Sequence, residues 1–179
     1  IREYIAHCSA TYIETLTPLR ICYHHDLFAQ VSGSDGTTVV LEQETDPTES
    51  RITVVFGNAR TRTSIERCAM LLARHKIDIK RAYLDLVEDP KHGSVTFVGF
   101  VVQSPDGGQL DPESELWEQI QTDLTRVKWV HYEVLNMTGR NPGLRIGPAE
   151  IVLGLCHLVH QVLNPKNRFE FTRERIVGC

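Results

Sequence analysis

The chain has 179 residues, which is enough for one domain or for a small domain with attached helices, and too few for two full enzyme domains. Hydrophobic residues make up 41% of the chain and charged residues 23%, a globular composition that excludes disordered, collagenous and transmembrane classes. The net charge of −4 has the wrong sign for a domain that binds by neutralising phosphates, so we expect neither nucleic acid nor an anionic membrane as a partner.

The chain carries five cysteines, and no two of them have the C-x-x-C spacing of a redox or zinc pair. We therefore expect reduced thiols in a cytoplasmic protein. The first residue is Ile1, no signal-peptide pattern follows it, and the last residues, FTRERIVGC, resemble a helix that stops without a cap. These features predict that the chain is a piece of a longer protein.

Residues 1–36 are expected to form leading helices. Apolar residues recur at helical spacing through the first 13 positions, which indicates a short helix. Thr17 followed by Pro18 then predicts the N-cap and first residue of a second helix, which ends before Gly33.

Residues 37–136 predict the central domain. After a preceding strand, Thr37–Gln43, the periodicity changes in the order strand, helix, strand, strand, helix, strand. This order is typical of an α+β fold, the ferredoxin-like βαββαβ sandwich with its split βαβ connection. The expected elements are, in chain order, Arg51–Phe56, a helix with a face from Ile65 to Leu72, Ile77–Leu86, Ser94–Val102, a helix from Asp111 to Val127 and Trp129–Leu135. Residues 137–179 are expected to form a trailing helical segment, with its main helix from Pro148 to about Leu163.

The strand Ser94–Val102 is apolar on both faces. One face carries Val95, Phe97 and Val101, and the other carries Val98, Phe100 and Val102. We expect the Phe97 face to meet the helices of the split βαβ unit. The other face then needs a second cover, either the leading helices or a second copy of the chain, and we favour the second copy.

One polar loop, Gly57–Ser64, stands between the first strand and the first helix of the split βαβ unit. A helix N-terminus presents free N–H groups and a positive dipole end, so an amino-acid carboxylate is predicted to bind there with help from Asn58, Arg60 or Arg62. The alternative, which the residue types favour over ligand binding, is that Thr61 or Thr63 caps the helix while the arginines are solvated or pair with an acid such as Asp85.

No catalytic residue and no metal site is predicted. The glycine patterns that cradle nucleotides or expose a nucleophile are absent from the sequence, so we expect no dinucleotide site in the chain. Cys156 and His160 share a helix face but lack a third ligand, and an apolar stripe is the better interpretation. His24 and His25 are interpreted as a surface pair whose side chains point about 100° apart.

The run ARHKIDIKRAYLDLVEDPKHGSVTFVGFVV, residues 73–102, resembles the ACT-type regulatory module, and its AYLDL and HGSVT segments resemble the amino-terminal part of the large NAD-dependent glutamate dehydrogenases. The flanking ATYIETLTP and NRFEFTRERI are similar to the segments around that module, so the resemblance extends from about Tyr4 to Ile176. Two positions depart from the ACT pattern. Asn58 stands in a loop that often carries Asp-x-x-Gly, and Lys76 stands where a glycine usually ends the first helix.

The resemblance implies a non-catalytic regulatory or oligomerisation segment of a large glutamate dehydrogenase. In such an enzyme the NAD-binding part that converts L-glutamate to 2-oxoglutarate lies further along the polypeptide, and this segment holds no cofactor. The implied partners are further copies of the chain, the rest of the parent polypeptide and an amino-acid effector. The alternative is an amino-acid-sensing ACT-like module of another multidomain enzyme, such as a uridylyltransferase. A small stand-alone enzyme with His or Cys chemistry is the third hypothesis.

Overall fold

The computed structural model describes the chain except residues 59–60, 92, 142, 167–169, 171 and 178–179, and it describes only the backbone of residues 61, 62 and 174. The chain divides into two compact units, Ile1–Lys128 and Trp129–Cys179. Each unit has its own set of secondary-structure elements.

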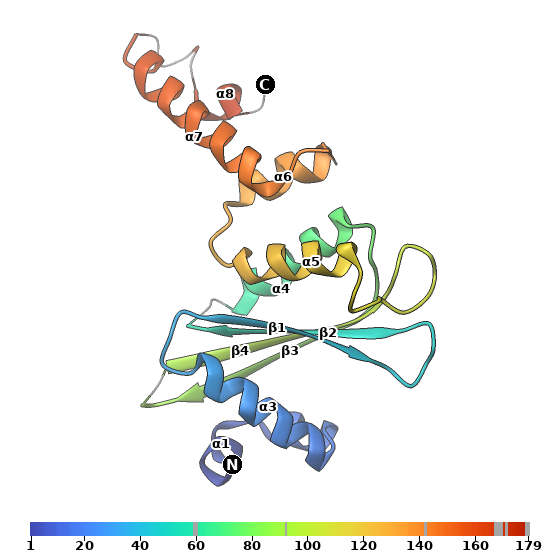
Figure 1. The fold of residues 1–179 in the computed structure, drawn as a ribbon. Coiled ribbons are helices and arrows are strands. Elements are labelled where there is room, and N and C mark those ends of the chain that lie inside the picture. Colours follow the sequence, from blue (N-terminus) through green and yellow to red (C-terminus); the bar gives the residue numbers. More distant parts are fainter. Residues whose placement is uncertain (59–60, 92, 142, 167–169, 171, 178–179) are drawn as a thin grey trace. The chain divides into compact units, whose positions relative to one another are not determined.

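The first unit is built on a four-stranded antiparallel sheet in the order β1-β2-β4-β3 (Figure 1). β2 and β3 run parallel to each other with β4 between them, because each pairs antiparallel with β4. Helix α4 (Thr61–Arg74) connects β2 to β3, which is the split βαβ connection expected from the sequence. The α+β class is therefore confirmed. The strands are β1 (Thr37–Gln43), β2 (Ser50–Gly57), β3 (Asp78–Asp89) and β4 (Gly93–Gln103).

Helices cover both faces of this sheet (Figure 1). Helix α4 and α5 (Glu115–Arg126) lie on one side, and the leading helices α1 (Arg2–His7), α2 (Ala10–Thr15) and α3 (Pro18–Val31) pack on the other. Under the leading helices lies a buried cluster of Tyr4, Tyr12, Leu27, Phe28, Val31, Val55, Val87, Val95 and Phe97. The side chains that alternate with these on β2 and β4 are also fully buried, among them Ile52, Val54, Val98 and Phe100.

The face assignment made for β4 from the sequence is wrong. Phe97 lies under the leading helices, while Val98, Phe100 and Val102 point to the side of α4 and α5. Both alternating sets of β4 are apolar, so hydrophobic periodicity alone does not tell which set meets which helices. Of the two covers considered, the leading helices cover one face of the sheet, so β2 and β4 are buried without a second copy. The edge strand β3 keeps Tyr83, Leu84 and Leu86 exposed.

The strand predicted over Trp129–Leu135 is also wrong, because the chain forms helix α6 (Tyr132–Arg140) there. β1 pairs along the whole free edge of β2, and this leaves no place beside β2 for a strand that follows α5. Val134 and Thr138, four residues apart, are both buried, which is the spacing of a helix face.

The start of helix α3 agrees with the sequence prediction, and the start of helix α5 differs from it. Thr17 caps α3 and Pro18 opens it, as predicted. Helix α5 begins later than expected, because the hydroxyl of Ser114, and not Asp111, accepts the hydrogen bond from the Trp117 amide.

Helix α4 ends in a left-handed turn without glycine. Lys76, which stands where the ACT pattern usually has a glycine, has a φ of 59°, in the left-handed region that favours glycine. The amide of Lys76 donates to the carbonyl of Ala73 at 2.9 Å, and the amide of Ile77 donates to that of Leu72 at 3.0 Å. The cap is therefore formed by a residue with a side chain.

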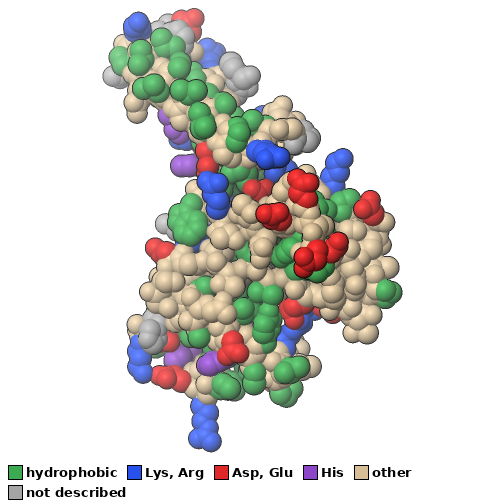
Figure 2. All heavy atoms as spheres, viewed as in Figure 1, with side chains coloured by type: hydrophobic (Ala, Val, Ile, Leu, Met, Phe, Trp, Pro, Cys, Tyr) green, Lys and Arg blue, Asp and Glu red, His purple; other side chains and the backbone are tan. Residues whose placement is uncertain are grey.

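The second unit contains α6, α7 (Ile146–Leu163) and α8 (Arg173–Val177), and α7 packs against both of the others. Helix α7 exposes an apolar stripe, and Figure 2 shows hydrophobic side chains gathered over this helix. Among the described residues α7 is the one helix long and apolar enough to cross a bilayer, which is weak evidence for a membrane span. The stripe consists of Ile151, Val152, Leu155, Leu158, Val159 and Val162.

Candidate functional site

The predicted anion site lies at the end of β2. Asn58 has a φ of 52°, and its side-chain amide donates to the carbonyl oxygen of Ser34 at 3.3 Å. Arg60 lies outside the described residues, and the side chain of Arg62 also lies outside them. The prediction for these two arginines therefore stays a prediction.

A cavity of about 320 Å³, here called the loop cavity, opens next to Asn58. Its lining includes Thr63 and Ser64 from the first turns of α4, together with two cations, Arg67 and Lys128, that sequence reasoning missed. The prediction stopped at Ser64, although Arg67 is only three residues further along the same helix and points to the same end. The lining is completed by Phe56 and Val127.

The two cations of the loop cavity differ in their existing bonds. The Lys128 ammonium donates to the carbonyls of Gly57 (2.5 Å) and Asp35 (3.2 Å) and to the Asp35 carboxylate (3.3 Å). Arg67 donates to the Lys128 carbonyl at 2.8 Å through one terminal nitrogen. A guanidinium has five N–H donors, so Arg67 is the cation better able to take an anion beside the helix start.

A second cavity, of about 350 Å³, lies on the opposite face of the sheet under the leading helices and is here called the sheet-face cavity. Gly99 in β4 forms part of its floor. The register places Gly99 between Thr53 of β2 and Tyr83 of β3, so the middle of this row has no side chain. The full lining is Thr15, Leu16, Thr17, Arg20, His24, Glu44, Arg51, Thr53, Tyr83, Asp85, Phe97 and Gly99.

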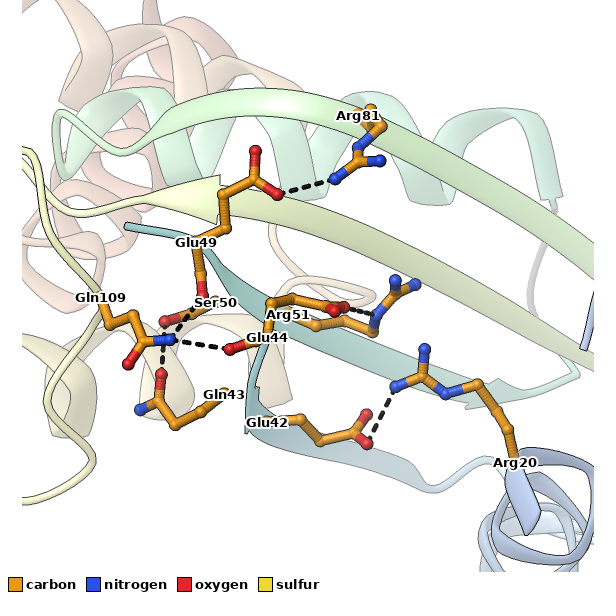
Figure 3. Close-up of polar contacts among 9 residues, drawn as sticks. All are labelled: Arg20, Glu42, Gln43, Glu44, Glu49, Ser50, Arg51, Arg81 and Gln109. Atoms are coloured by element: carbon orange, nitrogen blue, oxygen red, sulfur yellow. Dashed lines mark hydrogen bonds and ion pairs between the residues drawn. The ribbon is translucent and has the colours of Figure 1, made fainter. Parts of the chain in front are cut away.

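Two arginines border the sheet-face cavity, each held by one glutamate (Figure 3). Arg20 of α3 bonds Glu42 at 3.0 Å, and Nε of Arg51 bonds Glu44 at 2.5 Å. The Arg51 guanidinium also lies 5.4 Å from the centroid of the Tyr83 ring. These bonds fix the direction of both guanidinium groups and leave each with further N–H donors.

The hairpin that carries Glu44 is held by a glutamine. The side-chain amide of Gln109 donates to the backbone oxygens of Glu44 (3.0 Å) and Glu49 (3.1 Å) (Figure 3). It also donates to the backbone oxygen of Asp46 at 3.0 Å. This places the β1–β2 turn, and with it the carboxylate that orients Arg51.

Two polar side chains of the sheet-face cavity lack partners within the described residues. Thr53 is 2% exposed and its hydroxyl makes no hydrogen bond there. Asp85, half-buried, makes neither a hydrogen bond nor an ion pair with any described residue, and burial raises the pKa of its carboxyl. From the sequence, Asp85 was named only as an example of an acid that could pair with the loop arginines.

His24 is buried rather than at the surface, so the interpretation of His24 and His25 as a surface pair is wrong. The His24 ring stacks on Phe97 with centroids 5.1 Å apart and shares a 2.6 Å hydrogen bond with the Tyr12 hydroxyl. Burial, with Arg20 and Arg51 nearby, lowers the pKa of His24 to about 4. The ring is therefore neutral at neutral pH, and it forms part of the cavity wall.

The described residues contain no group of three or more His, Cys, Asp or Glu side chains able to hold a metal ion. Cys8, Cys22, Cys68 and Cys156 are free thiols. Burial raises the pKa of Cys8 and of Cys68, which makes both weak nucleophiles.

Comparison with protein-family models gives no match for this chain, and comparison with curated protein sequences gives none either.

Proposed function

We propose that this chain is a non-catalytic regulatory and oligomerisation segment of a large NAD-dependent glutamate dehydrogenase. The parent polypeptide oxidises L-glutamate to 2-oxoglutarate with NAD, in a part outside this chain, and works in the cytoplasm. The observation that carries the proposal is the split βαβ arrangement of β2, α4, β3 and β4 with a polar cavity at the β2–α4 loop. The resemblance of residues 73–102 to the ACT-type module points the same way.

The finer fold in this proposal is a ferredoxin-like, ACT-type sandwich whose sheet is completed from the amino-terminal side. β1 takes the edge position beside β2 that the sequence pattern assigned to a strand after α5. The split βαβ connection, the feature shared with ferredoxin-like folds, supports this assignment.

The proposed effector is an amino acid whose carboxylate sits in the loop cavity. Support comes from the start of α4, where Thr63 and Ser64 line the cavity, and from Arg67 beside it. Asn58, Arg60 and Arg62 remain the proposed residues of the preceding loop. Arg67→Gln is expected to weaken carboxylate binding, because it removes the cation of the loop cavity with the most unused donors.

The proposed assembly surface is the apolar stripe of α7. Six large apolar side chains on one helix are more than 35% exposed, and a stripe of this kind marks an interaction site on a soluble protein. Since the leading helices cover the Phe97 face of the sheet, this stripe is the apolar contact proposed for a homo-oligomer.

The test is to purify the parent polypeptide and assay it for glutamate-dependent reduction of NAD. We expect this activity in the parent, and in the isolated chain neither the activity nor saturable NAD binding by calorimetry. A parent that lacks glutamate oxidation and instead transfers uridylyl groups would replace the proposal with its alternative, an amino-acid-sensing module of a uridylyltransferase.

A further inference from the structure

We propose that the sheet-face cavity binds a small zwitterion of the α-amino-acid class, with its ammonium group at Asp85 and its carboxylate at Arg51 and Arg20. This inference goes beyond the proposed function, because it concerns a different cavity from the proposed effector site. It also holds whichever enzyme carries the chain.

The space for the ligand comes from Gly99. A Cβ placed on Gly99 would lie 3.7 Å from side-chain atoms of Tyr83, an ordinary contact, and it would point into the gap between Tyr83 and Thr53. A strand glycine weakens the sheet, so a glycine in the middle of β4 marks a place where another group approaches the backbone. The cavity volume of about 350 Å³ lies within the range of small-molecule sites.

The charges of the sheet-face cavity are opposite and separated. Tyr83 and Asp85 are neighbours on one face of β3, about 7 Å apart along the strand. The Arg51 guanidinium lies over the Tyr83 ring, and it bonds Glu44 instead of Asp85. A cation and an anion therefore face one cavity without pairing, which is the arrangement that a molecule carrying both charges completes.

The lining between the two charges suits the rest of an amino acid. Phe97 and Leu16 offer apolar surface to a side chain, and Gly99 offers backbone. The Thr53 hydroxyl, unpartnered among the described residues and almost wholly buried, gains a hydrogen bond from a polar group placed beside it. A neutral His24 on the wall adds no further charge.

A ligand with one charge fits this cavity less well. An anion alone leaves the half-buried Asp85 carboxylate unpaired and near a second negative charge. An amine alone pairs with Asp85 but leaves the remaining N–H donors of Arg20 and Arg51, each bonded to one glutamate, without an acceptor from the ligand. The zwitterion satisfies both ends at once, so both single-charge analogues are expected to bind more weakly.

The experiment uses the whole chain, titrated with glycine, L-leucine, L-glutamate and L-lysine and followed by backbone amide chemical shifts. We expect at least one of the four to shift amides around Thr53, Asp85 and Gly99 with saturation. For L-leucine, the matched analogues are 3-methylbutylamine, which lacks the carboxylate, and 4-methylpentanoate, which lacks the ammonium. Each analogue of a binding amino acid is expected to bind at least roughly tenfold more weakly.

Two variants locate the binding. Asp85→Asn keeps the shape and removes the charge, and we expect it to weaken the binding amino acid by roughly tenfold or more. Gly99→Val fills the floor of the cavity and is expected to abolish binding. Asp106→Asn, at an exposed loop position, is the matched control and should bind like the unchanged chain. The far-UV spectrum and urea midpoint of each variant show that it is folded.

The inference would be overturned by the absence of any saturable shift at millimolar concentration with all four amino acids, by binding that is unchanged in Asp85→Asn, or by equal affinity for the single-charge analogues. Shifts confined to Asn58 and the start of α4 would also overturn it, while supporting the effector site of the proposed function. A parent enzyme of another class would refute that function and leave the sheet-face site untouched.

Discussion

Asp85 holds an unusual position, a half-buried carboxylate that has no partner among the described residues. Its pKa is raised by burial, so the folded protein binds a proton at this carboxyl more tightly than the unfolded chain does. The contribution of Asp85 to stability is therefore fully present at low pH and is lost as the pH rises through the raised pKa.

The first prediction is that Asp85→Asn stabilises the unliganded protein at neutral pH by less than about 1 kcal/mol, because the amide removes a desolvated charge that solvent still partly screens. The gain should vanish in acid, below the ordinary aspartate pKa of about 3.9. Urea unfolding at a series of pH values measures this. A loss of stability at neutral pH would mean that the carboxylate has a partner after all.

The second prediction concerns His24. Its pKa of about 4 in the folded protein lies below the ordinary value of 6.5, so the unfolded chain takes up the proton first as the pH falls. The stability contributed by the neutral ring is present above pH 6.5 and falls toward pH 4, by about 1.4 kcal/mol per pH unit at most. His24→Gln, which keeps a hydrogen-bonding group for Tyr12, should reduce this loss of stability between pH 6.5 and pH 4.

The control for His24 is its neighbour. His25→Gln leaves the buried ring in place, and its free energy of unfolding is expected to fall with decreasing pH as in the unchanged chain. If both variants reduce this fall equally, His24 is not its cause.

At the residue scale, sequence reasoning located part of the loop cavity and missed the sheet-face cavity. The loop after β2 was found because a polar run between a strand and a helix can be recognised in the sequence. The sheet-face cavity was not, since Thr53, Tyr83 and Gly99 meet only through strand register. His24 was misplaced because its partner Phe97 is 73 positions further along the chain, and no local pattern records such a contact.

At the scale of elements, α4 ends with Lys76 in a left-handed conformation. The third prediction is that Lys76→Gly raises the free energy of unfolding by about 0.5–1 kcal/mol, since glycine adopts this conformation without the clash of a Cβ. Lys76→Ala is the control, because it removes the long side chain and keeps the Cβ. Equal stability of the two variants in urea would show that the backbone strain is negligible.

Most elements were predicted from the sequence because their apolar residues recur with a clear helical or alternating period. The four strands of the sheet and helices α3, α4, α5 and α7 all lie where the alternating or helical patterns predicted them. The error at residues 129–135 came from a short segment whose aromatic and β-branched residues suit either structure. A strand at these residues would need a free edge beside β2, and β1 occupies that edge.

At the scale of the whole molecule, the apolar stripe of α7 is the largest exposed apolar feature on one described helix. The fourth prediction is that Leu155→Glu lowers the mass of any assembly that the chain forms, measured by light scattering at high micromolar concentration, because it places a charge within the contact. Leu19→Glu, at a leucine that is 82% exposed on α3, is the control and should leave the mass unchanged. A monomeric unchanged chain would contradict self-association through α7.

The position of β1 also bears on how the first unit folds. Because β1 and β2 are joined by the short turn of residues 44–49, the sheet closes its edge through a hairpin instead of through a return from beyond α5. Short-range pairing of this kind lowers the entropy lost on forming the sheet and favours fast folding. Every strand of the sheet lies before residue 104 in the chain. The first unit can therefore assemble its sheet without the second unit, and a released chain that ends just beyond α5 is expected to resist proteolysis.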